Sequence, residues 1–541
     1  MATKSNLTDL IYKNSYYIFL SIFLIWMGIG CFPLYCYEGD SMHTILGCNT
    51  VFTNGVNFPP SYSYEYDMQP LIYVVVPFLK LILPFLNLEQ IFCLLTAIAA
   101  LINVILSIEL VYRLTKLNRL LILFATFLLP ESIAIGMYPN TAIFAMLFVV
   151  TALHLLLSKR FILSTIFLII APVFRIDVLI IYPTVLVILW WMGYSIWKSI
   201  KTTSIIAFAV LGGIIIAYSI LQANPLTTTL GGYEKWNNTI SSIRVFIAVY
   251  TYYTICNLLL IPIGIYKLLK NKDIKLLSVI IVPIVLNHIV YARMGCATKH
   301  YLYMMPFTIS LSTLAIQFLK DKARPHSFYK YSLIITILLY TCISIRFKYP
   351  NRPWLNQIYS MPQQVPCINL LNESYTKYQF SIGLGGGLLL KTYDEFMLFS
   401  GNLFYPIYIN KYKTEQLAKR NHAYKYMKEK LNISYLGSSW DDMANIAIAY
   451  TNNNYLFSSN DNEFILKNKD NKISILRHEI DEDNDENARY NIWYQTINML
   501  KKDNNNLYCF TLVDSHIYNL DKLSRREVVN KLTNNLYYIK K

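Results

Sequence analysis

The pattern of apolar and polar residues changes near residue 347. Before it, long apolar runs recur at intervals of about 25 to 35 residues, as expected when about 20 apolar residues span a ~30 Å hydrocarbon core. After it, short apolar stretches such as Lys472–Leu476 alternate with polar segments and with a predicted helix over 414–431. We expect a polytopic α-helical membrane domain over 1–346 and an extracytoplasmic α/β or α+β domain over 347–541.

The apolar runs predict about eleven transmembrane helices. They fall near residues 15–34, 88–112, 119–137, 141–157, 161–174, 178–197, 202–221, 244–266, 276–292, 301–319 and 331–346.

The first of these runs has no convincing cleavage site, so we expect a retained signal anchor. The run 70–86 contains Lys80 and is interrupted by Pro77 and Pro84. These residues favour a juxtamembrane helix that lies along the outer surface and does not cross.

The positions of lysine and arginine support this topology. With a cytoplasmic N-terminus, seventeen cations lie in cytoplasmic segments, and only five lie in outer ones, namely Arg175, Lys235, Arg244, Arg293 and Lys299. Such an excess is typical of cytoplasmic loops. The outer loop over 35–69 and the whole C-terminal domain are then extracytoplasmic.

Composition agrees with a membrane protein, since 55% of the residues are hydrophobic, 15% are charged and the mean hydropathy is +0.36. The net charge is +16, but residues 1–346 carry 24 Lys and Arg against 12 Asp and Glu, while 347–541 carry 24 against 20. Most of the excess therefore lies in membrane loops, where orientation explains it. We expect no nucleic-acid partner.

The outer loop over 35–69 has four acidic residues and no Lys or Arg. Two of them, Glu38 and Asp40, follow the first apolar run so closely that they must meet water, a partner or a substrate at the membrane surface. A carboxylate in this position suits a general base that acts on a hydroxyl group. The alternative is that these acids are only solvated, which stays open above all for Glu65.

Four short motifs have the order and spacing of a known layout. They are "GDS" at 39–41, "MQPLIY" at 68–73, "FRIDVLIIYP" at 174–183 and "KHYLYMMP" at 299–306. With the surrounding spans, this layout resembles the GT-C superfamily of membrane glycosyltransferases, and within it the protein O-mannosyltransferases and the bacterial aminoarabinose transferases.

The resemblance implies a catalytic carboxylate at Asp40, with Glu38 in place of the second family acid, whose position holds Ser41. Gln69 replaces the first proline of the family's Pro-Pro-Leu motif. The implied reaction moves a sugar from a polyprenyl-phosphate donor to a hydroxyl of a lipid, glycan or protein acceptor. We expect further contacts with substrate from Asp67 and His43.

The departing phosphate of such a donor needs cations. Candidate phosphate-binding residues occupy the two later motifs and their surroundings: Arg175, Arg293, Lys299, His300 and Tyr301. Alternatively, Arg175 pairs with Asp177, and the cations near span ends extend to the interface as many membrane cations do. His300 is equally compatible with an ordinary interfacial histidine.

No His, Cys, Asp or Glu cluster has the spacing of a zinc site. We expect no certain cofactor, and a divalent cation (Mg or Mn) at Glu38 and Asp40 stays open. The motif "GLGGG" at 383–387 has no strand–helix context and is predicted to be a turn. Either Cys36 with Cys48 or Cys367 with Cys509 could form a disulfide, and buried thiols are the alternative.

Two other functions remain as alternatives, an O-antigen or polysaccharide polymerase and a transporter or flippase of lipid-linked saccharides. The polymerase would depend on outer arginines and little on Asp40. The Asn, Lys, Ile and Tyr bias favours a bacterial inner membrane with a periplasmic C-terminal domain. An endoplasmic reticulum location would place the sequons at Asn237, Asn372 and Asn432 in the lumen.

Overall fold

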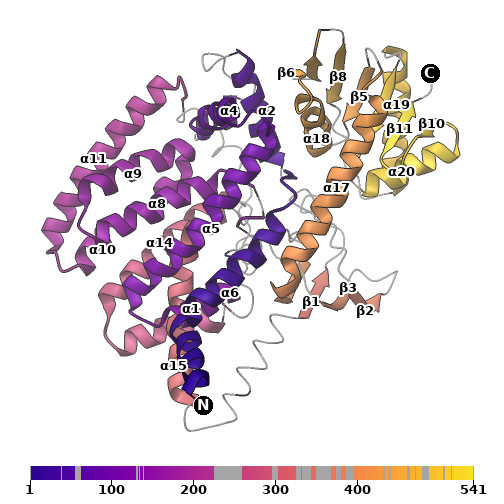
Figure 1. Cartoon of the computed structure of the whole chain (residues 1–541). Coiled ribbons are helices and arrows are strands. Elements are labelled where there is room, and N and C mark those ends of the chain that lie inside the picture. Colours follow the sequence, from indigo (N-terminus) through magenta and orange to yellow (C-terminus); the bar gives the residue numbers. More distant parts are fainter. Residues whose placement is uncertain are drawn as a thin grey trace. The chain divides into compact units, whose positions relative to one another are not determined.

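The computed structural model (Figure 1) describes the chain except residues 1, 38, 55–62, 130–131, 133–134, 138, 225–256, 258, 295–301, 324–330, 332–342, 349–366, 373–378, 385–394, 401, 431–432, 438–439, 460–462, 470, 478–485, 504–505, 513 and 540–541. It divides into two compact units. The first unit consists of residues 1–32, 96–220 and 224–410, and the second of 33–95, 221–223 and 411–541. The domain boundary after residue 346 stays a prediction.

The first unit is mainly helical. Its helices are α1 (Ala2–Cys31), most of α5 (Leu88–Thr115), α6 (Arg119–Leu128), α8 (Ala142–Leu157), α9 (Phe161–Phe174), η1 (Ile176–Ile181), α10 (Thr184–Trp191), α11 (Ile196–Ile220), α14 (Ile274–Met294) and α15 (Met305–Ala323). Helices α8 and α9 form a hairpin, and the Ser164 hydroxyl donates to the Ala152 carbonyl across it at 2.9 Å. Because Ser164 is fully buried, this bond satisfies a hydroxyl that is removed from solvent.

Four helices in the described part of the chain are long and apolar enough to cross a membrane: Asn14–Cys31, Leu88–Thr115, Ile196–Ile220 and Leu302–Lys322. Six shorter apolar helices have 10 to 17 residues. The predicted number of about eleven spans is therefore not confirmed. These apolar helices support an integral membrane protein, while the side on which each terminus lies stays a prediction.

Lysine residues occupy tight turns between helices of the first unit. Lys116, Lys159 and Lys272 have positive φ angles of 58°, 59° and 57°. The left-handed conformation ends many helices, although it usually falls to Gly or Asn. A cation at a helix C-terminus is electrostatically favourable, which suits lysine to these positions. All three lysines lie in connections that the charge pattern predicts to be cytoplasmic.

A four-stranded antiparallel sheet follows in the chain, with the order β2-β3-β1-β4. Its strands are β1 (Ile343–Lys348), β2 (Cys367–Asn372), β3 (Gln379–Leu384) and β4 (Glu395–Ser400). Residues 343–346 thus belong to a strand, and their assignment to the last predicted span is wrong. Gly383, opposite Ser344, and Leu384 are the last two residues of β3, so the "GLGGG" motif begins in a strand, contrary to expectation. Backbone pairing with two neighbouring strands determines this conformation, and local sequence does not show it.

The second unit combines the segment 33–95 with the C-terminal part of the chain. Its N-terminal helices are α2 (Gly39–Asn54), α3 (Ser63–Met68) and α4 (Ile72–Ile82), and its C-terminal helices are α17 (Tyr405–Met427, from residue 411), α18 (Trp440–Thr451), α19 (Glu486–Asp503) and α20 (Asp514–Arg525). Helix α17 overlaps the helix predicted over 414–431. Helix α4 lies within the predicted juxtamembrane run 70–86 and has 11 residues, too few to span a ~30 Å core.

A seven-stranded mixed sheet organises the C-terminal part of the second unit, with the order β10-β11-β9-β5-β8-β7-β6. The strands are β5 (Ile433–Gly437), β6 (Leu456–Ser459), β7 (Glu463–Lys467), β8 (Lys472–Arg477), β9 (Leu507–Phe510), β10 (Val529–Lys531) and β11 (Leu536–Ile539). Strand β5 is parallel to both β8 and β9, and the other pairs are antiparallel. The prediction of a C-terminal domain with both strands and helices is confirmed for this region.

The core on one side of this sheet is built from strands and the last two long helices. Trp493 of α19 and Leu520 of α20 pack against Leu436 of β5 and Tyr537 of β11, and all four are at most 1% exposed. Full burial of such a side chain contributes roughly 1.5–3 kcal/mol relative to leaving it exposed. The C-terminal part therefore has a hydrophobic core of its own.

Five described cysteines, Cys31, Cys36, Cys48, Cys93 and Cys509, are buried thiols outside any disulfide. The suggested Cys36–Cys48 pair is therefore wrong, and for Cys509 the thiol alternative also holds. Cys48 lies against the α4 backbone, with its sulfur 3.8 Å from the Ile72 carbonyl oxygen. Cys367 is in β2, in the other compact unit, and nothing further is described of its side chain.

We expect Gly264→Ala to destabilise the first unit. A Cβ atom at Gly264, which lies in the helical stretch 259–270, would come within 2.4 Å of the Leu311 backbone oxygen. Backbone cannot move aside as a flexible side chain can, so overpacking should cost about 1–3 kcal/mol. Thermal unfolding in detergent measures the change.

Gly212→Ala in α11 is the matched control, because nothing lies within 4 Å of a Cβ atom there. Alanine favours a helix by roughly 0.5–1 kcal/mol over glycine, so this variant should unfold at the same temperature or a higher one. Equal melting temperatures for the two variants would contradict the close approach of Gly264 to Leu311.

Candidate functional site

Asp40 lies in the first turn of α2, where a carboxylate interacts favourably with the helix N-terminus. Its side chain is exposed, whereas the helix is buried from Ser41 to Val51. Glu38, the second predicted catalytic acid, lies outside the described residues. The segment predicted as an outer loop over 35–69 thus contains two helices, α2 and α3. Helix α2 lacks a clear apolar stripe, and contacts with distant parts of the chain bury it on all sides.

These contacts come from the C-terminal part of the second unit. The Asn49 side-chain oxygen accepts a hydrogen bond from the Phe457 amide at 3.2 Å, and the Thr50 hydroxyl donates to the Phe457 carbonyl at 3.4 Å. The His43 ring meets the Phe464 ring edge-on, with 6.0 Å between centroids. Polar residues of α2 therefore bond to β6, which no local pattern predicts.

The "MQPLIY" motif also reaches α2. Gln69 is buried, and its side-chain amide donates to the Thr44 hydroxyl oxygen at 2.8 Å. The Thr44 hydroxyl in turn donates to the Asp40 carbonyl at 2.9 Å. Two predicted site residues, Gln69 and Asp40, are thereby connected through one threonine. Asp67, in α3, is half-buried.

Two of the motifs on the predicted outer face, together with the segment at 137–141, converge in the first unit. The Arg175 Nε donates to Asp177 at 2.9 Å, and the Tyr303 hydroxyl donates to the other Asp177 oxygen at 2.7 Å. A terminal nitrogen of Arg175 lies 3.4 Å from the Thr141 hydroxyl. Arg175 and Asp177 belong to "FRID", Tyr303 to "KHYLYMMP" and Thr141 to "MYPNT" at 137–141. The alternative that Arg175 pairs with Asp177 is confirmed, with the two side chains 13% and 12% exposed.

This cluster lies at one end of α8, and a group of predicted cytoplasmic cations lies at the other end. Thr141 precedes α8, while Arg113 donates to the Ser158 hydroxyl at 2.8 Å just after it. Arg119 pairs with Glu109 at 3.0 Å in the same unit. A helix of 16 residues is about 24 Å long, close to the thickness of the hydrocarbon core. Arg175 is thus separated from the cation-rich end as the topology predicts.

The remaining predicted phosphate-binding residues are not described in full. Lys299, His300 and Tyr301 lie outside the described residues, and the side chain of Arg293, near the end of α14, does too. Tyr303 was not among the predicted site residues, although it lies inside the quoted motif "KHYLYMMP". Within the described part of the chain there is no group of three or more His, Cys, Asp and Glu residues that could hold a metal ion.

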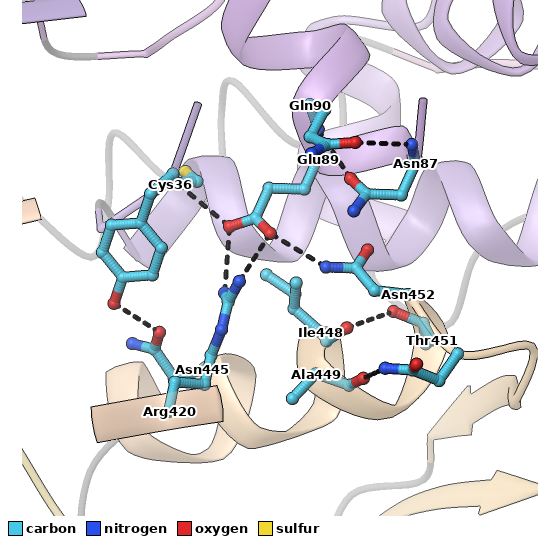
Figure 2. A network of polar contacts seen from close by, with 12 residues as sticks. Cys36, Asn87, Glu89, Gln90, Arg420, Asn445, Ile448, Ala449, Thr451 and Asn452 are labelled. Carbon is cyan, nitrogen blue, oxygen red and sulfur yellow. Dashed lines mark hydrogen bonds and ion pairs between the residues drawn. The ribbon is translucent and has the colours of Figure 1, made fainter. Parts of the chain in front are cut away.

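Sequence analysis missed a buried polar network in the second unit (Figure 2). Two Arg420 nitrogens donate to the two Glu89 oxygens at 2.9 and 2.7 Å, and both side chains are only 2% exposed. Glu89 also accepts from the Cys36 amide at 3.0 Å and from the Asn452 side chain at 2.9 Å. The only hint in the sequence was an acid at the start of the apolar helix α5, which could have prompted a search for a partner.

The electrostatics of this network keep the Arg420 guanidinium charged. Burial alone lowers the pKa of Arg420, but the adjacent Glu89 carboxylate raises it above its ordinary value. Burial raises the pKa of Tyr35 well above that of an exposed tyrosine, so this phenol stays neutral. Its hydroxyl donates to the Asn445 side chain at 2.7 Å, and its ring lies 4.8 Å from the Arg420 guanidinium.

No family model and no curated protein matches this chain. Among solved structures it is similar to ArnT from Cupriavidus metallidurans in the apo state, with 11% identity and a TM-score of 0.46. It is also similar to the same ArnT bound to undecaprenyl phosphate, with 10% identity and a TM-score of 0.47. Each match covers 60% of this chain and 63% of the ArnT chain.

The chain spans less than two thirds of the length of ArnT. Similarity at this level does not assign the chain to a family, and its function is therefore a proposal.

We expect Tyr303→Phe and Arg175→Gln to be coupled in stability, because both residues bond to the same carboxylate. Each single variant should lower the free energy of unfolding, Tyr303→Phe by roughly 1.5–3 kcal/mol as the loss of a hydrogen bond to a charged group. The double variant should differ from the sum of the two by about 0.5–3 kcal/mol. Thermal unfolding of the three variants measures this, and simple additivity would contradict a shared role of Asp177.

Proposed function

We propose that this protein is a membrane glycosyltransferase that moves a sugar from a polyprenyl-phosphate-linked donor to an acceptor hydroxyl at the outer face of the membrane. The observation that carries the proposal is the convergence of Thr141 and Tyr303 on the Arg175–Asp177 pair. This arginine is held by Asp177 at the end of α8 that lies away from the predicted cytoplasmic cations. An oriented guanidinium there suits a phosphate group at the membrane surface.

In the proposed reaction the acceptor oxygen attacks the anomeric carbon of the sugar. A new C–O bond forms as the bond between that carbon and the phosphate oxygen breaks. Asp40 accepts the proton of the attacking hydroxyl as general base. Its exposure in the first turn of α2 is compatible with access for a substrate. Glu38, two residues earlier, is the second candidate for this role.

The leaving group is a polyprenyl phosphate, on which negative charge develops as the bond breaks. Cationic donors stabilise such charge more strongly than neutral ones. Among the candidates, Arg175 is the one whose side chain the structure describes. Its bond to Asp177 orients the guanidinium plane. Arg293, Lys299, His300 and Tyr301 remain predictions for the same phosphate.

The acceptor and the rest of the donor would be held by residues around α2. Gln69, Asp67 and His43 are the candidates, and Gln69 and His43 are buried against neighbouring residues of the second unit. The acceptor is a lipid, a glycan or a protein. The reaction as written needs no metal ion, and a divalent cation (Mg or Mn) at Glu38 and Asp40 remains an untested prediction, as does a bacterial inner membrane with a periplasmic C-terminal domain.

We expect Asp40→Asn to abolish most of the transfer activity. Removal of a general base typically costs 10²–10⁴-fold in rate, and asparagine keeps the shape of the side chain. Release of polyprenyl phosphate from a set of polyprenyl-phosphate sugars, with lipid and glycan acceptors added to the purified protein in detergent, measures the turnover.

Glu415→Gln is the control, because Glu415 makes only an exposed pair with Lys411 in α17. It should retain wild-type turnover. Full turnover in Asp40→Asn would rule out this residue as the base and direct attention to Glu38. A wild-type protein that is inactive with every donor would contradict the proposal and favour a polymerase or a transporter of lipid-linked saccharides.

A further inference from the structure

The segment Tyr35–Tyr37 leads directly into the acidic residues that precede and begin α2. Each of its three residues contacts a different part of the second unit. The Tyr35 hydroxyl donates to Asn445 of α18 at 2.7 Å, and the Cys36 amide donates to Glu89 at 3.0 Å. The Tyr37 ring meets the Tyr412 ring edge-on, with 5.8 Å between centroids. The segment is therefore fixed over its whole length.

Helix α17 supplies most of the contacts. Arg420 lies over the Tyr35 ring, with 4.8 Å from the guanidinium carbon to the centroid, and Lys413 lies 5.6 Å from the centroid of Tyr37. Tyr412, which meets Tyr37, belongs to the same helix. These residues are 375 to 385 positions away in the sequence, so only the tertiary structure brings them to the segment.

Glu89, at the start of α5, bonds both to the Tyr35–Tyr37 segment and to Arg420 of helix α17 (Figure 2). Its carboxylate accepts four hydrogen bonds: two from Arg420, one from Asn452 and one from the Cys36 backbone. All four come from protein groups, and the side chain is 2% exposed. Without Arg420, the buried Glu89 carboxylate would have no counter-ion, which is strongly unfavourable.

Buried ion pairs are poor candidates for a purely stabilising role. Replacing such a pair with apolar residues of similar volume is often neutral or stabilising. What apolar residues cannot replace is the acceptor for the Cys36 amide. The pair therefore fixes the position of the Cys36 backbone amide, which hydrophobic packing alone would not do.

We propose that Glu89 and Arg420 are positioning residues, which fix the Tyr35–Tyr37 segment and through it Asp40, the proposed general base. This inference rests on the proposed function, because it requires an acid in this region to act as the base. Helix α17 of the C-terminal part then supports the reaction by holding this segment, and not by contact with the substrate. A misplacement of a catalytic group by 1 Å can cost about 100-fold in rate.

The test uses the full-length protein with Glu89→Leu and Arg420→Met combined, so that no buried charge remains unpaired. Two quantities are measured, turnover with a polyprenyl-phosphate sugar and the rate at which N-ethylmaleimide alkylates Cys36, followed by mass spectrometry of the peptide that contains it. Cys36 is fully buried in the wild type, so its alkylation reports opening of the segment.

We expect the double variant to fold, with kcat lowered about 10- to 100-fold and KM for the donor little changed. Alkylation of Cys36 should accelerate at least about tenfold, the effect of losing a hydrogen bond to a charged acceptor. The matched control is Glu109→Gln with Arg119→Gln, which removes another two-bond Arg–Glu pair, 3.0 and 3.2 Å long, from the first unit. Both quantities should stay at their wild-type values in this control.

Unchanged turnover in the folded double variant would overturn the inference, whatever the alkylation rate. Lost turnover with unchanged alkylation would also overturn it, because the pair would then act by another route. If the double variant does not fold, Tyr35→Phe, which removes only the bond to Asn445, should lower kcat and accelerate alkylation by about 2- to 10-fold, and wild-type values would overturn the inference.

The alkylation measurement separates this inference from the proposed function. If the wild type has no turnover with any donor, the proposed function fails and the assignment of catalytic acids falls with it. Faster alkylation in the double variant would then still support the role of the pair in fixing the segment, and slow alkylation would refute that role as well.

Discussion

The buried ion pair between Glu89 and Arg420 constrains the second unit more than any other interaction described here. A carboxylate and a guanidinium removed from water cost several kcal/mol each unless every oxygen is satisfied, and Glu89 meets this condition with four donors. The two residues are 331 positions apart. Either part alone would leave one buried charge without its partner, which is strongly destabilising.

This constraint explains why residues 33–95 and 411–541 form one compact unit although nearly the whole membrane-spanning sequence separates them. The burial of helix α2 depends on the same constraint. With Tyr35 and Cys36 held in place, the polar residues Asn49 and Thr50 find partners on the Phe457 backbone, and Gln69 finds Thr44. Each of these bonds satisfies a buried polar group, which without a partner would oppose burial of the helix.

In the first unit the dominant constraint is the low dielectric constant of an apolar helix bundle. Charged residues can remain only at helix ends or in pairs. The two ends of α8 illustrate this, with the Arg175–Asp177 pair at one and Arg113 at the other. Burial of Tyr303 and its bond to Asp177 show that the cluster around Arg175 is a fixed structure. A fixed arginine suits recognition of a phosphate better than a mobile one, because less ordering is needed on binding.

The sequence by itself determined the membrane character, the mixed strand and helix content of the C-terminal part and the proximity of Arg175 to Asp177. Each of these depends on residues close together in the chain or on bulk hydrophobicity. Only the tertiary structure decided the burial of α2, the strand at 343–346, the convergence of Thr141 and Tyr303 on the FRID motif and the pairing of Glu89 with Arg420. These features arise from contacts between distant segments, and a buried charge shows its partner only when the chain has folded around it.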